Sequence, residues 1–144
     1  MFVPAEFTVP QRLETPRFVL EPLGPQHNEA DYAAWSSSME HFHARPGCEG
    51  SSWPHEMSLE ENRADLEMHA RDFEQRTGFT YTVLDPADGT VIGCVYIYPR
   101  DTGVRVRSWV RAASAELDAE LWRAVSEWLA KDWPFERVDY AARS

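Results

Sequence analysis

The sequence has little of what would mark a secreted or membrane-inserted protein. Its 144 residues include two cysteines, Cys48 and Cys94, which lie far apart and form no CxxC motif. Such sparse cysteines disfavour a disulfide framework and favour a reducing cytoplasm. No segment approaches the ~20 apolar residues of a membrane span, and the N-terminus lacks the basic and apolar regions of a signal peptide. We therefore expect a cytoplasmic protein without a membrane-spanning segment.

Positive charge is scarce as well. The chain has 14 lysines and arginines against 24 aspartates and glutamates, which gives a formal net charge of −10 and a pI of about 4.9. An acidic surface repels phosphate backbones and anionic lipid. We therefore expect no nucleic acid and no membrane surface among its partners, whereas a cationic ligand such as an amine is compatible with this charge.

Length and apolar content favour one folded domain that spans residues 1–144. Hydrophobic residues make up 43% of the chain and aromatic residues 12%, which is enough for one core. Pro4, Pro10 and Pro16 break the first segment, because each proline lacks an N–H donor. Residues 1–16 are therefore expected to form an extended N-terminal arm.

The spacing of apolar residues predicts a mixed α/β fold. Strands are expected at 17–23, 79–84, 91–98, 105–111 and 138–141, and helices at 26–38, 58–77 and 114–132. Ser58 and Glu61 predict a capping box, Gly78 is the expected closing residue of that helix, and Ser114 is the expected N-cap of the last one. The order β-α-α-β-β-β-α-β implies a mixed, mostly antiparallel sheet with helices on both faces.

Residues 39–57 form a long segment without periodicity, and such loops often carry function in compact domains. This loop contains His41, His43, Cys48 and His55. Their spacing lacks the paired geometry of CxxC or HExxH zinc motifs. We interpret them as exposed loop residues and expect no bound metal.

Three segments resemble the GNAT superfamily of acyl-CoA-dependent N-acyltransferases. Residues 13–23 (LETPRFVLEPL) are similar to the entry signature of the branch that acetylates ribosomal-protein N-termini and related amines, with Glu21 in place of an arginine. Residues 83–93 (VLDPADGTVIG) resemble the central hairpin, and residues 108–111 (SWVR) resemble the strand that leads into the cofactor loop. The resemblance implies a twisted, mostly antiparallel sheet flanked by helices.

The resemblance also implies a reaction and a set of site residues. An amine, either a small molecule or a peptide N-terminus, would attack the thioester of acetyl-CoA directly. Candidate catalytic residues are Ser108, Glu56 and His55, and candidate cofactor-binding residues are Trp109, Val110, Arg111, Ser114 and Ala115. Trp53, Tyr81, Tyr96 and Tyr98 are candidates for the substrate pocket, although such aromatic side chains also occur in cores.

The sequence departs from the family pattern after Arg111. Glycines in the family's loop let backbone N–H groups approach the pyrophosphate at a helix N-terminus. Residues 112–120 (AASAELDAE) contain no glycine and no basic residue, and they carry Glu116, Asp118 and Glu120. Acidic residues are common in first helical turns, but here they would repel a phosphate. An alternative function is therefore a non-catalytic GNAT-like module that binds a small ligand or a protein and has lost coenzyme A binding.

The C-terminal end is short relative to the family. Its members usually continue after the fifth strand with a helix that often supplies a tyrosine as general acid. We expect Tyr140 on the strand itself and do not assign that role to it. The sheet edge left open leads us to expect a homodimer.

Overall fold

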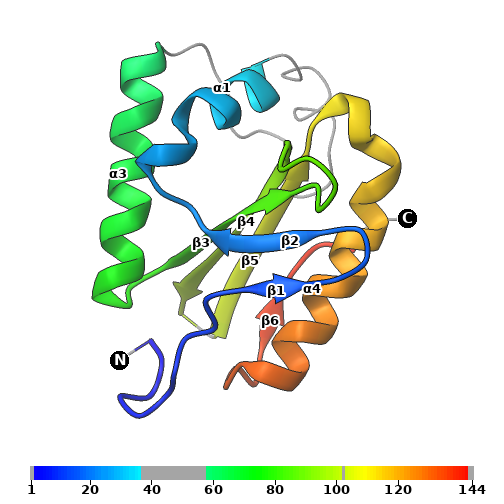
Figure 1. The fold of residues 1–144 in the computed structure, drawn as a ribbon. Coiled ribbons are helices and arrows are strands. Elements are labelled where there is room, and N and C mark those ends of the chain that lie inside the picture. Colours follow the sequence, from blue (N-terminus) through cyan, green and yellow to red (C-terminus); the bar gives the residue numbers. More distant parts are fainter. Residues whose placement is uncertain (1, 37–57, 102, 143–144) are drawn as a thin grey trace.

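The computed structural model describes residues 2–36, 58–101 and 103–142, and their strands form one six-stranded sheet (Figure 1). The strands are β1 (Leu13–Glu14), β2 (Val19–Pro22), β3 (Phe79–Leu84), β4 (Val91–Arg100), β5 (Gly103–Val110) and β6 (Val138–Asp139). The helices are α1 (Asn28–Ser36), α3 (Leu59–Gln75) and α4 (Asp118–Asp132), with short 3-10 helices η1 (Pro25–His27) and η2 (Ala112–Leu117).

The strands follow one another across the sheet in chain order. All neighbours are antiparallel except β5 and β6, which are parallel because α4 crosses between them. This arrangement confirms the predicted mixed, mostly antiparallel fold and its element order, with the short β1 as an addition inside the predicted N-terminal arm. No helix of the described ranges is long and apolar enough to cross a bilayer.

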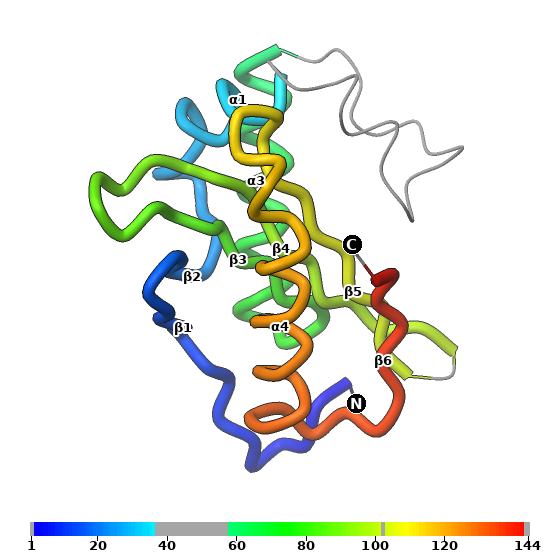
Figure 2. Tube along the Cα trace, turned by 90° about the vertical axis from the view of Figure 1, so that its right-hand side faces the viewer, coloured from blue at the N-terminus to red at the C-terminus, as the bar shows by residue number. Residues whose placement is uncertain are grey.

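The two faces of the sheet are covered by different helices. Figure 2 shows α4 running along one face, while α1 and α3 lie on the other. Alternation along β5 puts Val106 and Val110 in the core with α4, and Trp109 in the core with α1 and α3. The second face also carries the Asn62 network and the hydroxyls of Tyr96 and Tyr98, which are described below.

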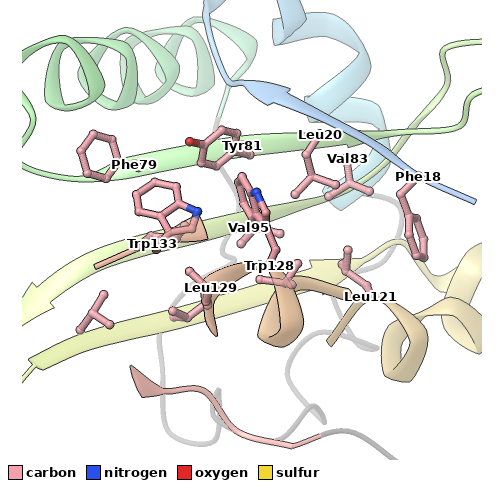
Figure 3. Packing of buried hydrophobic residues seen from close by; sticks show 14 of the residues in the cluster. Phe18, Leu20, Phe79, Tyr81, Val83, Val95, Leu121, Trp128, Leu129 and Trp133 are labelled. Atoms are coloured by element: carbon pink, nitrogen blue, oxygen red, sulfur yellow. The ribbon is translucent and has the colours of Figure 1, made fainter. Parts of the chain in front are cut away.

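Aromatic rings fill the core between the sheet and α4 (Figure 3). Trp133, which follows α4, packs against Phe79, Tyr81 and Trp128 with ring centroids 5.4, 6.3 and 5.4 Å away. The N-terminal arm packs against this core and covers part of it. Its Phe2 ring stacks on Phe79, and its backbone is tied to α3 by the Arg76 guanidinium, which donates to the carbonyl oxygens of Pro4 and Phe7.

Of the two predictions made for the ends of α3, the one for its N-terminus is confirmed and the one for its C-terminus is wrong. The Ser58–Glu61 capping box is confirmed, since Glu61 N–H donates to Ser58 Oγ at 3.0 Å and Ser58 N–H donates to Glu61 Oε1 at 2.9 Å. Gly78 as the left-handed closing residue is wrong, because Arg76 adopts that conformation with φ 63°. A Cβ at Gly78 would overlap the ring of Tyr98, so packing explains this glycine.

Candidate functional site

The candidate site lies where β5 and β6 part. Within the described residues the two strands pair at Val104↔Val138 and Arg105↔Asp139 and no further. Val104 N–H donates toward the β6 side, to Arg137 O at 3.0 Å, whereas Arg111 N–H donates toward β4, to Ile92 O at 2.8 Å. Because backbone groups alternate along a strand, the N–H and C=O groups of Ser108 and Val110 point to the side that β6 has left.

A hydroxyl pair lies at this opening. The buried Ser108 side chain shares a hydrogen bond of 2.6 Å with Tyr140 Oη, which comes from the residue just after β6. Trp122 of α4 donates its indole N–H to Tyr140 O at 3.3 Å and holds this segment in place. Ser108 was a predicted catalytic residue. Tyr140 was expected on the last strand and was given no role, but β6 ends at Asp139, so Tyr140 follows the strand and its hydroxyl contacts Ser108.

Gly93 keeps the neighbouring strand close to this edge. It pairs with Val110, and a Cβ there would overlap the carbonyl oxygen of Trp109. We expect Gly93→Ala to push β5 away from β4 and to destabilise the fold by about 1–3 kcal/mol, as overpacking does. Urea unfolding followed by circular dichroism measures this loss. Gly89→Ala is the control, because it strains the backbone at φ 75° but adds no steric overlap, with no atom within 4 Å of the added Cβ. Equal stability of G93A and wild type would contradict the prediction.

The predicted substrate-pocket tyrosines do not lie together. Tyr96 and Tyr98 are on the face of α1 and α3, where Tyr96 Oη accepts from Trp109 Nε1 at 3.0 Å and Tyr98 Oη donates to Asp72 Oδ2 at 2.8 Å. Burial raises the pKa of both phenols. Tyr81 is on the opposite face, buried in the core with its hydroxyl donating to Pro10 O at 2.6 Å, so it does not lie beside Tyr96 and Tyr98.

The predicted cofactor loop has an unexpected form. Residues Ala112–Leu117 make the 3-10 helix η2, and α4 begins only at Asp118. Ser114 is not an N-cap: its side chain is buried and its φ of −118° and ψ of 23° interrupt the helix. Ser114 N–H donates to Arg111 O at 2.9 Å, and Asp118 N–H donates to Ala115 O. These donors are therefore used inside the loop itself.

Carboxylates dominate the charge of this loop. Glu116 lies in η2, and Asp118 and Glu120 lie in the first turn of α4. The arginines nearby have acidic neighbours. Arg17 Nη1 is 3.4 Å from Glu120 Oε1. Hydrogen bonding by Thr90 lowers the pKa of Asp88, which lies in the β3–β4 turn. The positive charge of Arg111 adds to this lowering, so Arg111 lies near that turn.

A polar network is buried between α1 and α3. Asn62 of α3 donates to Asn28 Oδ1 at 2.8 Å and to Asp31 Oδ2 at 3.3 Å, and it accepts from Trp35 Nε1 at 3.1 Å. Asp31 is 4% exposed, and its Oδ1 has no hydrogen-bond partner within the described segments. Burial raises the pKa of this carboxyl from 3.8 to about 6.

The other predicted site residues lie outside the described residues. They are His55, Glu56 and Trp53, together with the loop group His41, His43 and Cys48. The structure therefore brings Ser108, Trp109, Val110 and Arg111 to one end of β5, with Ser114 and Ala115 in the loop that follows.

This architecture is the GNAT fold, and comparison with solved structures confirms the predicted resemblance. A Vibrio cholerae protein assigned as a ribosomal-protein-serine acetyltransferase superposes with a TM-score of 0.72 at 13% identity, over 90% of this chain and 72% of its own. The ribosomal-protein-S5-alanine acetyltransferase of Vibrio fischeri gives 0.67 at 14% identity, over 88% and 71%. The microcin C7 self-immunity acetyltransferase MccE, solved with acetyl-CoA and AMP, gives 0.69 at 12% identity, over 85% and 67%.

Sequence comparison gives no closer relationship. No protein-family model and no curated protein sequence matches the chain. At identities of 12–14% these structural similarities establish the fold alone.

Acetyl-CoA, the group that this fold implies, fits the site in one part and not in another. The N–H and C=O groups of Val110 point to the side of β5 away from β4, in the orientation in which an amide of an extended pantetheine arm would pair with a strand. The loop of residues 112–120 matches a pyrophosphate poorly, because the N–H groups of Ser114 and Asp118 are used internally and the charged side chains of the loop are carboxylates.

Proposed function

We propose that this protein is a GNAT-type N-acyltransferase that passes an acyl group from a pantetheine thioester, such as acetyl-CoA, to an amine. The observation that carries the proposal is the parting of β5 and β6 after two residue pairs, with the Ser108–Tyr140 hydroxyl pair at the opening. A small amine or a peptide N-terminus is the proposed acceptor, in line with the ribosomal-protein acetyltransferase named among the similar structures.

The residues at the opening have complementary roles in this reaction. Acetyl-CoA, when bound, supplies an activated acyl thioester. The Val110 N–H points to the open side of β5 and would stabilise negative charge that develops on the acyl oxygen. As the C–N bond forms and the C–S bond breaks, Tyr140 Oη would give its proton to the departing sulfur. The phenolate would be held by the hydrogen bond with Ser108 Oγ and would regain a proton from solvent, which receives the proton that the amine loses.

The amine must also lose a proton, and the residue that accepts this proton is a separate proposal. His55 and Glu56 keep the role that their residue types suggested, namely to accept that proton directly or through a water.

A second function is favoured by one specific observation. The three carboxylates of the loop, together with the internal use of the Ser114 and Asp118 N–H groups, oppose pyrophosphate binding. A non-catalytic GNAT-like module that binds a small ligand or a protein would have these features, since a fold does not establish an activity.

A turnover experiment separates the two functions. Thiol release from acetyl-CoA and from S-acetylpantetheine is followed with a panel of small amines and short peptides. Tyr140→Phe is expected to lower kcat by about 100-fold with little change in KM, as loss of a general acid does. Tyr32→Phe is the matched control, because Tyr32 packs edge-on against Trp35 in α1.

The results have distinct consequences for the two functions. Turnover by the wild type that is lost in Y140F and kept in Y32F supports the acyltransferase. If neither thioester is turned over and neither binds at millimolar concentration in isothermal titration, the non-catalytic function is supported and the proposal is wrong.

A further inference from the structure

We infer that a cavity at the opposite end of β5 from the Ser108–Tyr140 opening binds a small carboxylate with an apolar body, such as an aromatic acid. The cavity lies where β4 ends and β5 begins, beside the N-terminal arm at the lower end of the sheet in Figure 1. The 8 residues of β5 rise by ~3.3 Å each, so its two ends are about 23 Å apart. The inference therefore does not depend on the proposed function.

The cavity has the size of a small-molecule site. Its volume is about 810 Å³, within the range of ligand pockets in proteins. The arm contributes Phe2 and Ala5 to its wall, the end of β4 contributes Pro99 and Arg100, and the end of α3 contributes Arg76. Three segments distant in sequence thus enclose one space that has an apolar side and a charged side.

The charge of this cavity favours an anion. Both charged side chains of its described wall are arginines, in a chain whose formal net charge is −10. A neighbouring hollow that shares Phe2 with it differs, since it is lined by Asp101 and Glu136 as well as Arg137. The two positive charges also exceed the partial negative charge, about half an elementary charge, that a helix C-terminus such as that of α3 carries.

Arg76 offers hydrogen-bond donors to such an anion. It keeps a left-handed backbone with φ 63°, a conformation that glycine adopts more readily. Its Nη2 donates to Pro4 O at 2.7 Å and to Phe7 O at 3.0 Å. Among the residues that the structure describes, this guanidinium forms no ion pair, and its Nε and Nη1 have no hydrogen-bond acceptor. The planar fork of arginine matches the two oxygens of a carboxylate.

Arg100 supplies the second positive charge. Its Nη1 pairs with Asp139 of β6, but the two side chains are 46% and 55% exposed, and water screens such a pair. A carboxylate in the cavity can therefore share the charge of Arg100 with Asp139.

The apolar side of the cavity is held rigidly. The Phe2 ring stacks on Phe79 and on Phe135 with centroids 5.6 and 5.4 Å away, and Pro99 has a ring of fixed shape. A ligand that carries an aromatic or aliphatic body buries this surface, whereas an inorganic anion does not. The wall thus matches an organic acid better than a free phosphate.

The test compares three probes on the full chain. Phenylacetate and phenylacetamide have the same ring and differ in charge, and inorganic phosphate has charge without an apolar body. Each is titrated into the ¹⁵N-labelled protein, and dissociation constants are taken from the amide chemical shifts. We expect phenylacetate to bind about tenfold more tightly than either of the others. The shifts are expected at Ala5, Arg76 and Arg100 and not at Val110.

Three variants assign the binding to the cavity. Arg100→Gln is expected to weaken phenylacetate binding about tenfold, since it removes one cation without touching the arm. Arg76→Gly is expected to do the same, and glycine suits the left-handed backbone there. Arg71→Gln is the matched control, because Arg71 is exposed on α3 and does not line the cavity. It is expected to leave the affinity unchanged.

Phenylacetate binding that R100Q weakens and R71Q leaves unchanged would support the inference. Several results would overturn it: no shifts with phenylacetate at tens of millimolar, equal affinities for phenylacetate and phenylacetamide, phosphate binding as tightly as phenylacetate, or an equal loss of affinity in R71Q and R100Q. None of these results bears on acyl transfer, because the residues of the two sites are different.

Discussion

Replacement of Trp133 by alanine is expected to destabilise the protein by about 3–5 kcal/mol, the usual cost of truncating a buried tryptophan. Trp133 is 6% exposed and contacts rings from three parts of the chain: Phe7 of the arm, Tyr81 of β3 and Trp128 of α4. The cavity left behind would therefore separate the arm, the sheet and α4 from one another. Because a protein of this size is stable by only about 5–15 kcal/mol, the variant should lose a large share of its stability.

Trp133→Phe is the matched variant for this prediction. The indole Nε1 of Trp133 is buried and has no hydrogen-bond partner in the parts of the chain that the structure describes, which costs the native state free energy. Phenylalanine removes that donor and keeps an aromatic ring, so its loss should be under about 1.5 kcal/mol. Guanidinium unfolding monitored by far-UV circular dichroism measures both variants. Equal losses in W133A and W133F would contradict the central position of this ring.

Local signals in the sequence predicted most of the fold because their causes are local. The capping box of α3 needs only Ser58 and Glu61, and the β3–β4 turn needs only the left-handed Gly89, with φ 75°. The strand at β5 was predicted from alternating apolar residues, and its Val106 and Trp109 do lie on opposite faces of the sheet. Each of these features depends on residues within a few positions of one another.

The failures occurred where a distant segment decides the local structure. Arg76 takes a left-handed conformation that glycine usually takes, and its guanidinium is held there by carbonyls of Pro4 and Phe7, about seventy positions earlier in the chain. Gly78, the residue expected to close the helix, instead makes room for the ring of Tyr98. Helix-end statistics contain no information on either contact.

The sequence likewise predicted some residues of the candidate site and missed others. The end of β5 was placed correctly from its resemblance to the family strand, because that resemblance is a property of consecutive residues. Tyr140 was set aside as a strand residue, and its contact with Ser108 joins positions 32 apart through the early end of β6. The buried Asp31 was not a candidate either, since a lone acidic residue in an amphipathic helix normally faces solvent.

Asp31→Asn is expected to stabilise the protein at neutral pH by up to about 3 kcal/mol, and not at pH 4. Burial raises the pKa of this carboxyl from 3.8 to about 6, with Asp65 adding to the rise and Asn62 and His69 opposing it. The folded state therefore holds the proton more tightly than the unfolded state does. The stabilisation that comes from protonated Asp31 is complete below about pH 4 and is lost as the pH rises through about 6, at ~1.4 kcal/mol per pKa unit.

Asparagine keeps the shape of the protonated side chain and cannot ionise. Its oxygen can accept from Asn62 as Asp31 Oδ2 does, so the variant resembles the wild type at low pH and differs from it where the wild-type carboxylate is charged. Urea unfolding from pH 4 to pH 8 measures the difference, with the exposed Asp132→Asn at the end of α4 as the control. A difference between D31N and wild type that stays constant across this range would show that burial does not disfavour the charged form of Asp31.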